Sequence, residues 1–333
     1  MTIGIVARPH EQAILRRALL ACPEHLITWT VTSGEQAVER CARETPDLVL
    51  MGLSLEGAID GVETTRTVMA TTPCAILVVA AEGVRADRRR LFEAMGGGAL
   101  DAVDLTDPTL VVAKIASSAR LIADKSALAG AGRSTGHAAS TLSGHPLIAI
   151  GASAGGPAAL ATLLGGLPSD LPAAVVIVQH VDEHMASGLA DWLGQRSALA
   201  VRVAVEGDRP VAGTILLAGT NDHLVLKSAT TLGYTAEPRE YVYRPSVDVF
   251  FTSVSRLWRG EAVGVLLTGM GRDGALGLKA LRSQGRLTIA QDRASSAVFG
   301  MPKAAAAVGA AVDVLPVDRI AARLVDALAH TRL

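Results

Sequence analysis

The chain has 333 residues, of which 50% are hydrophobic and only 3% aromatic, so it is long enough for two domains with cores of Ala, Val, Leu and Ile. The net charge of −1 gives no electrostatic reason to expect nucleic-acid binding, and no apolar run predicts a transmembrane helix. The N-terminus lacks a secretory signal, and the three cysteines lack metal-binding spacing, so we expect a cytoplasmic protein with free thiols and without metal or cofactor.

The first part of the chain, residues 1–123, alternates short β-rich runs with helical patterns. Helices are predicted at residues 11–20, after Ser33 as an N-cap with Gln36 three residues on, and from Pro108. Strands are predicted at residues 2–7, 27–31, 47–51, 75–80 and 100–103. Alternation of this kind predicts a doubly wound α/β domain with a parallel sheet.

Composition changes at residues 124–145, which are rich in Ser, Gly, Ala and Thr and have no amphipathic period. We interpret this segment as a flexible linker, because a surface loop of that length within one domain is uncommon.

The remainder, residues 146–333, again alternates strand and helix patterns, which predicts a second α/β domain with a parallel sheet. Residues 201–241 are richer in short strands and turns, and they suggest an antiparallel extension. Strands are predicted at residues 146–150, 174–178, 214–218, 263–267 and 288–290, and helices at 158–164, 185–193, 246–257 and 275–282.

Ser153 lies where a predicted strand enters a glycine-rich turn and then a helix that begins near Pro157. Such a turn presents the hydroxyl at the carboxyl edge of the sheet, and the helix N-terminus favours developing negative charge. Two other interpretations stay open from this motif alone. The serine could simply cap the helix, or the loop could bind phosphate, although it lacks the lysine and the glycine spacing of such loops.

His180 follows the next buried strand and is therefore expected at the same sheet edge as Ser153, where it could act as a general base. His184 and His223 could instead join it in a metal site. No cysteine or carboxylate cluster of ligand spacing accompanies these histidines, which disfavours the metal interpretation.

Asp273 follows a third strand, within a glycine-rich turn before a helix. It could be the N-cap of that helix, the orienting carboxylate of a triad, or both. The sequence G-x-S-x-G around Ser153 also occurs in α/β-hydrolases. That family orders its triad Ser, Asp or Glu, then His, whereas His180 here precedes Asp273.

Five segments of the second domain, in this order, closely resemble CheB-type chemotaxis methylesterases and cover that domain nearly end to end. The resemblance implies that Ser153 is the nucleophile, His180 the general base and Asp273 its partner. Backbone amides of Ala154 and Met270 would form the oxyanion hole, although many relatives carry Thr at the position of Ala154. The segments are IGASAGGP, VQH, YRPSVDVFF, LLTGMGRDGA and TIAQDRASSAVFGMPKAA.

This resemblance implies hydrolysis of glutamate γ-methyl esters, and also deamidation of glutamine, on methyl-accepting chemotaxis-type receptors. Two other functions stay open: a non-catalytic adaptor of a receptor array, and a small-molecule carboxylesterase. The intact set of serine, histidine and aspartate argues against the adaptor.

The first domain resembles a response-regulator receiver that lacks the residues needed for phosphorylation. The family pattern places two acids after the first strand, where this chain has Ala7 and Arg8, and the phospho-acceptor aspartate at Gly52. The hydroxyl and lysine positions correspond to Ala80 and Leu105. Phosphorylation needs Mg²⁺ held by carboxylates, and the remaining acids, Glu56 and Asp60, lie too far along the following loop. We therefore interpret the domain as a pseudo-receiver that regulates by binding a partner, such as a histidine kinase or another signalling protein, rather than one kept only for stability or docking.

Overall fold

The computed structural model describes residues 1–80, 88–124, 145–241 and 243–330. The chain divides into two compact units, residues 1–129 and 130–333, and each is described by itself. The predicted linker falls on residues that lie, except at its two ends, outside the described ranges, so its boundaries stay a prediction. Every helix in the described ranges is too short or too polar to cross a membrane.

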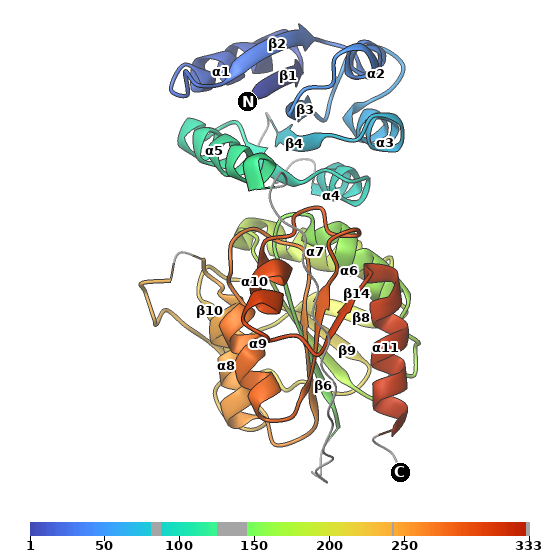
Figure 1. Ribbon diagram of the computed structural model, residues 1–333, viewed down its shortest axis with the longest axis vertical. Coiled ribbons are helices and arrows are strands. Elements are labelled where there is room, and N and C mark those ends of the chain that lie inside the picture. Colours follow the sequence, from blue (N-terminus) through green and yellow to red (C-terminus); the bar gives the residue numbers. More distant parts are fainter. Residues whose placement is uncertain (81–87, 125–144, 242, 331–333) are drawn as a thin grey trace. The chain divides into compact units, whose positions relative to one another are not determined.

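The first unit has a parallel sheet of five strands in the order β2-β1-β3-β4-β5. Helices α1 and α5 pack together on one face, and α2, α3 and α4 on the other (Figure 1). This doubly wound sheet confirms the predicted fold class. Its elements are β1 (Thr2–Val6), α1 (Pro9–Leu19), β2 (Leu26–Val31), α2 (Gly34–Arg43), β3 (Leu48–Gly52), α3 (Gly61–Thr71), β4 (Ala75–Ala80), α4 (Arg88–Gly96), β5 (Asp101–Asp104) and α5 (Pro108–Asp124).

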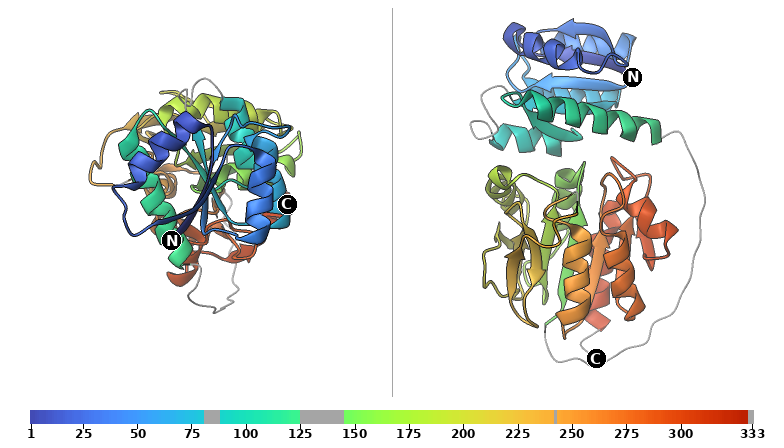
Figure 2. Two further views of the ribbon diagram at one scale, coloured as in Figure 1. Left: turned by 90° about the horizontal axis from the view of Figure 1, so that it is seen from above. Right: turned by 90° about the vertical axis from the view of Figure 1, so that its left-hand side faces the viewer.

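The second unit has a sheet of seven parallel strands in the order β14-β13-β12-β6-β7-β9-β8. Helices α8, α9 and α10 cover one face, and α6, α7 and α11 the other (Figure 2). Its elements are β6 (Leu147–Ala152), α6 (Gly156–Gly165), β7 (Ala174–Gln179), α7 (Glu183–Gly194), β8 (Ala200–Val203), β9 (Thr214–Leu217), β10 (His223–Leu226), β11 (Leu232–Thr235), α8 (Val247–Leu257), β12 (Ala262–Leu266), α9 (Ala275–Ser283), β13 (Leu287–Gln291), α10 (Met301–Ala307), β14 (Asp313–Leu315) and α11 (Val317–His330).

The segment at residues 201–241 matches the expected antiparallel extension only in part. Strands β10 and β11 form a separate antiparallel hairpin, as expected. The expectation is wrong for β8 and β9, which pair parallel and continue the main sheet. The apolar run of β9 is mostly buried, which is typical of a strand within a parallel sheet.

The order of the central strands decides where the candidate residues meet. The first strand of this sheet in the sequence is β6, and β7, β9 and β8 lie in that order on one side of it. The chain then returns and places β12 against the other side of β6. Gly151 is level with Leu266 of β12, and Ala152 is level with Gln179 of β7. The segments that follow these three strands therefore emerge at one sheet edge, beside the point where strand order reverses and where open α/β sheets bind ligands.

Candidate active site

Ser153 follows β6 directly and stands before the N-terminus of α6. Its backbone N–H donates to the carbonyl of Thr268 at 3.0 Å, and its own carbonyl accepts from Gly156 N–H at 2.7 Å. Gly155 caps α6 with a φ of 72°, a left-handed conformation that a side chain would strain. A Cβ there would also lie 2.5 Å from that of Ala297. This turn therefore depends on glycine to hold the serine in place.

His180 follows β7, and its ring joins Ser153 to Asp273. Nδ1 lies 3.1 Å from Ser153 Oγ, and Nε2 lies 2.8 Å from Asp273 Oδ2. An ionised carboxylate only accepts hydrogen bonds, so Nε2 carries the proton and the Nδ1 lone pair faces the serine hydroxyl. Serine proteases of the chymotrypsin type turn the ring the other way, with Nε2 toward the serine. Either ring nitrogen can accept a proton from a serine hydroxyl.

Asp273 is buried and accepts hydrogen bonds at both carboxylate oxygens. Besides His180, Oδ2 accepts from the N–H of Val247 at 2.7 Å, while Oδ1 accepts from Ser246 Oγ at 2.8 Å and from Asp248 N–H at 3.0 Å. Burial alone would raise the pKa of Asp273, but the hydrogen bond and charge of His180, together with these donors, lower it below its usual value. The carboxylate therefore stays ionised at neutral pH.

The interpretation of Asp273 as the N-cap of its own helix is wrong. The N-cap of α9 is Gly274, and Asp273 instead receives the first two amides of α8, whose N-cap is Ser246. In return, Asp248 of α8 accepts from Gly277 N–H of α9 at 2.7 Å. The two helices thus cap each other, because their N-termini meet, and the positive end of α8 supports the charge on Asp273.

Asp248, in the first turn of α8, is a second buried carboxylate close to Asp273. Burial and the negative charge of Asp273 raise the pKa of Asp248 to about 6, although backbone amides at the start of α9, including that of Gly277, oppose the shift. Its environment thus differs from that of Asp273, whose pKa is lowered and whose carboxylate accepts from the His180 ring and from the start of α8.

The loop after β12 packs closely on Ser153. A Cβ on Gly269 would lie 2.7 Å from that of Ser153, and Thr268 Oγ1 donates to the carbonyl of Ala154 at 2.9 Å. The amide N–H groups of Ala154 and Met270 donate no hydrogen bond to another described residue. Ala154 follows Ser153 directly, and Met270 follows Gly269, so both amides belong to the two loops that meet at Ser153.

Sequence reasoning gave no role to Tyr243, the first residue of the YRPSVDVFF segment. Its ring stacks on that of His180, with centroids 4.3 Å apart and an interplanar angle of 8°. The stack covers one face of the imidazole and restricts its rotation. The only sequence signal was that a segment without an assigned role begins with an aromatic residue.

The other two histidines do not join His180. His223 is fully buried, its Nε2 lies 3.0 Å from the carbonyl of Pro238, and its Nδ1 accepts from Ser246 N–H at 3.0 Å. Both ring nitrogens are therefore engaged by the backbone. His184 lies in the first turn of α7, with half of its side chain exposed.

In the first unit, the position expected for a phospho-acceptor is occupied by the backbone of Gly52 at the end of β3. A Cβ there would lie 3.1 Å from Glu11 Oε2. Glu11 is buried, accepts from Arg8 N–H at 2.8 Å and lies 3.6 Å from the Arg8 guanidinium. An internal ion pair thus lies beside this position.

The remaining acids of this edge have other partners. Glu56 accepts from Thr32 Oγ1 at 2.5 Å, whereas Asp60 caps α3 and lies 2.9 Å from Arg90. Ala80 and Leu105, at the ends of β4 and β5, are buried apolar residues. The described part of this edge therefore offers no set of free carboxylates.

Comparison with known proteins identifies relatives that cover the whole length of this chain. The sequence model of the CheB methylesterase family matches residues 148–324. A protein-glutamate methylesterase/protein-glutamine glutaminase of Cupriavidus pinatubonensis is 55% identical, covering 100% of this chain and 99% of that protein. A namesake from Mesorhizobium japonicum is 51% identical over 98% of each chain.

A solved structure also resembles the second unit. The catalytic domain of the CheB methylesterase of Thermotoga maritima aligns with a TM-score of 0.53 and 32% identity, and covers 56% of this chain and 99% of that domain. The parallel sheet that positions Ser153 is thus shared with a protein of the same family as the sequence match.

Proposed function

This chain belongs to the CheB methylesterase family, and from that premise we propose that it is a protein-glutamate methylesterase with Ser153, His180 and Asp273 as its triad. Its substrates are glutamate γ-methyl esters of methyl-accepting chemotaxis-type receptors, and the same machinery deamidates glutamine. The observation that carries the proposal is the hydrogen-bonded chain from Ser153 Oγ through His180 to Asp273.

The reaction proceeds through an acyl-enzyme. His180 Nδ1 takes the proton of Ser153 as Oγ attacks the ester carbonyl, and Asp273 holds the ring and stabilises the imidazolium. The proton then passes to the leaving methoxy group, and methanol departs. Water, activated by the same nitrogen, hydrolyses the acyl-enzyme and leaves a glutamate carboxylate. With glutamine the leaving group is ammonia.

The oxyanion of both tetrahedral intermediates is bound by the amides of Ala154 and Met270. Their lack of other hydrogen bonds to described residues supports this role, as does the positive end of α6 next to Ser153. One such donor typically contributes about 10²- to 10³-fold in rate.

Methanol release from methylated receptor helices tests the substrate class. We expect turnover of the receptor ester to exceed that of short-chain nitrophenyl esters in kcat/KM, because remote contacts contribute to transition-state binding. Rapid turnover of nitrophenyl esters without receptor demethylation would show a small-molecule carboxylesterase. No turnover of either ester would favour the adaptor.

We further propose that the first unit is a pseudo-receiver, which docks a signalling protein such as a histidine kinase, and that the enzyme works in the cytoplasm. The glycine at the acceptor position and the Arg8–Glu11 pair beside it support this. Within the described part of this edge, the buried carboxylate of Glu11 lies against the Arg8 guanidinium, which opposes binding of Mg²⁺ and an acyl phosphate there.

A titration with Mg²⁺ and beryllofluoride, followed by NMR of the full chain, tests the pseudo-receiver. We expect no saturable shifts in residues at the ends of β1, β3 and β4 up to millimolar concentrations. A Gly52→Asp variant is a matched comparison that restores only the acceptor. It should also show no saturable shifts, because the metal-binding acids are missing. Saturable binding to the unchanged chain would refute the proposal.

A further inference from the structure

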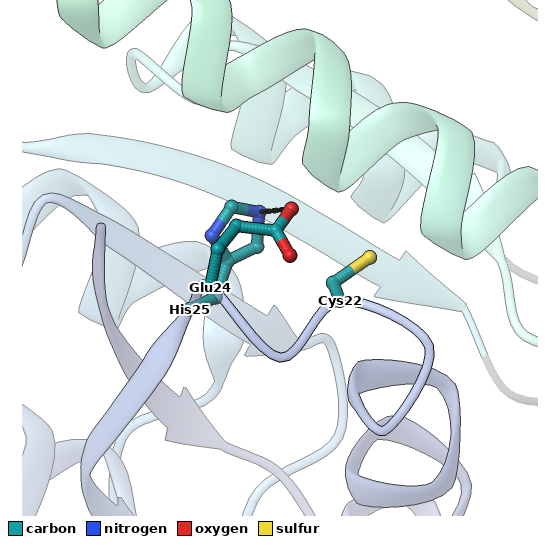
Figure 3. A group of neighbouring side chains, drawn as sticks. All are labelled: Cys22, Glu24 and His25. Carbon is teal, nitrogen blue, oxygen red and sulfur yellow. Dashed lines mark ion pairs between the residues drawn. The ribbon is translucent and has the colours of Figure 1, made fainter.

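A second set of chemically reactive side chains lies in the first unit, at the turn between α1 and β2. Cys22, Glu24 and His25 place a sulfur, a carboxylate oxygen and a ring nitrogen within 4.8 Å of one another (Figure 3). Among the described residues, this is the one group of three such side chains gathered closely enough to hold a metal ion.

The backbone of this turn prearranges two of the three donors. The N–H of His25 donates to the carbonyl of Cys22 at 3.1 Å, which closes a β-turn with Pro23 at its second position. The turn is held on both sides, because Cys22 N–H donates to Leu19 at the end of α1 and Leu26 begins β2. A C-x-x-H turn brings sulfur and nitrogen to one side, in the same way as the short ligand spacings of structural zinc sites.

The His25 side chain is an independent indication of a ligand. It is only 5% exposed, yet neither ring nitrogen has a hydrogen-bond partner among the described residues. A Glu24 oxygen lies 3.5 Å from Nε2, which is beyond the length of a good hydrogen bond. Buried polar groups are normally satisfied, and a metal ion would satisfy this one.

We propose that Cys22, Glu24 and His25 bind a zinc ion, or another thiophilic divalent ion, with water at the fourth position. Thiolate, imidazole and carboxylate are zinc ligands, whereas Mg²⁺ prefers oxygen alone. Tetrahedral zinc with these ligands needs donors about 3.3–3.8 Å apart, so the group must contract by roughly 1 Å. Glu24 is 65% exposed and is free to make that movement.

Binding converts the Cys22 thiol to a thiolate and releases its proton to solvent, while the zinc–sulfur bond forms without a change of oxidation state. Because the thiol must lose its proton to bind the metal, we expect zinc affinity to increase with pH. Spacing between cysteines does not reveal a site with a single thiol.

Titration of the untagged full chain with Co²⁺ and Zn²⁺ tests the site. We expect one equivalent of Co²⁺ to give a sulfur-to-cobalt charge-transfer band, which Zn²⁺ abolishes and Mg²⁺ leaves unchanged. Cys22→Ser should remove the band. Losing a ligand through His25→Ala or Glu24→Gln should weaken Zn²⁺ binding at least about 10-fold.

Matched controls are Cys74→Ser, which removes a free thiol outside the group, and His10→Ala, at an exposed histidine. Both should bind as the unchanged chain does. Glu24→Gln alters an exposed side chain and keeps the test valid if the buried variants unfold. Absence of the charge-transfer band, or unchanged Zn²⁺ affinity in Glu24→Gln and Cys22→Ser, would overturn the proposal.

Discussion

Replacing Ser153 by Ala is expected to lower methanol release from methylated receptor helices by about 10⁵- to 10⁶-fold, the loss typical of a removed serine nucleophile. The variant keeps the oxyanion donors and His180, but no acyl-enzyme can form. Burst kinetics with an activated ester should lose their fast phase for the same reason. Loss of a hydroxyl at a half-buried position should leave the fold intact, so the thermal midpoint should change little.

The matched control is Ser169→Ala, which removes an exposed serine of the same unit. It should retain full activity. If Ser153→Ala released methanol as fast as the unchanged chain, the assignment of the nucleophile would be wrong and the hydrogen-bonded chain would be structural only.

Asp273→Asn is expected to reduce kcat by about 10⁴-fold, as in other serine hydrolases in which the orienting carboxylate becomes an amide. An amide nitrogen facing His180 would donate to Nε2 and place the ring proton on Nδ1, where it faces Ser153 and blocks proton transfer. The amide also cannot satisfy all the donors at Asp273, which include the amides of Val247 and Asp248. Single-turnover methanol release measures the effect.

The same variant predicts a pH dependence of stability. The folded-state pKa of Asp273 is lowered, so the ionised carboxylate stabilises the fold above the unfolded pKa, and this stability is lost as pH falls through the folded value. The difference in thermal midpoint between the unchanged chain and Asp273→Asn should therefore be largest near neutral pH and shrink in acid. Asp170→Asn, at an exposed acid, should show no such trend. A constant difference would contradict the role of the ionised form.

Local patterns were sufficient to predict most of the architecture. The apolar runs that became β3, β4, β6 and β7 are buried at nearly every position, and a buried continuous run has few alternatives to a parallel strand. Helix starts followed from capping chemistry, as at Ser33, whose side chain accepts from Gln36 N–H. The exception was β8 and β9, because whether a strand pairs parallel depends on where the connecting chain returns.

By itself, the sequence determined the two α/β units, the family, and the three strand ends that carry Ser153, His180 and Asp273. Only the tertiary structure decided what these residues contact. The ring orientation of His180, its stack with Tyr243 and the cross-capping of α8 and α9 join residues that are far apart in the chain. The same holds for the approach of the Glu11 carboxylate to Gly52 at the end of β3. Periodicity and capping report on neighbours within a few residues, whereas these contacts are set by strand order and packing.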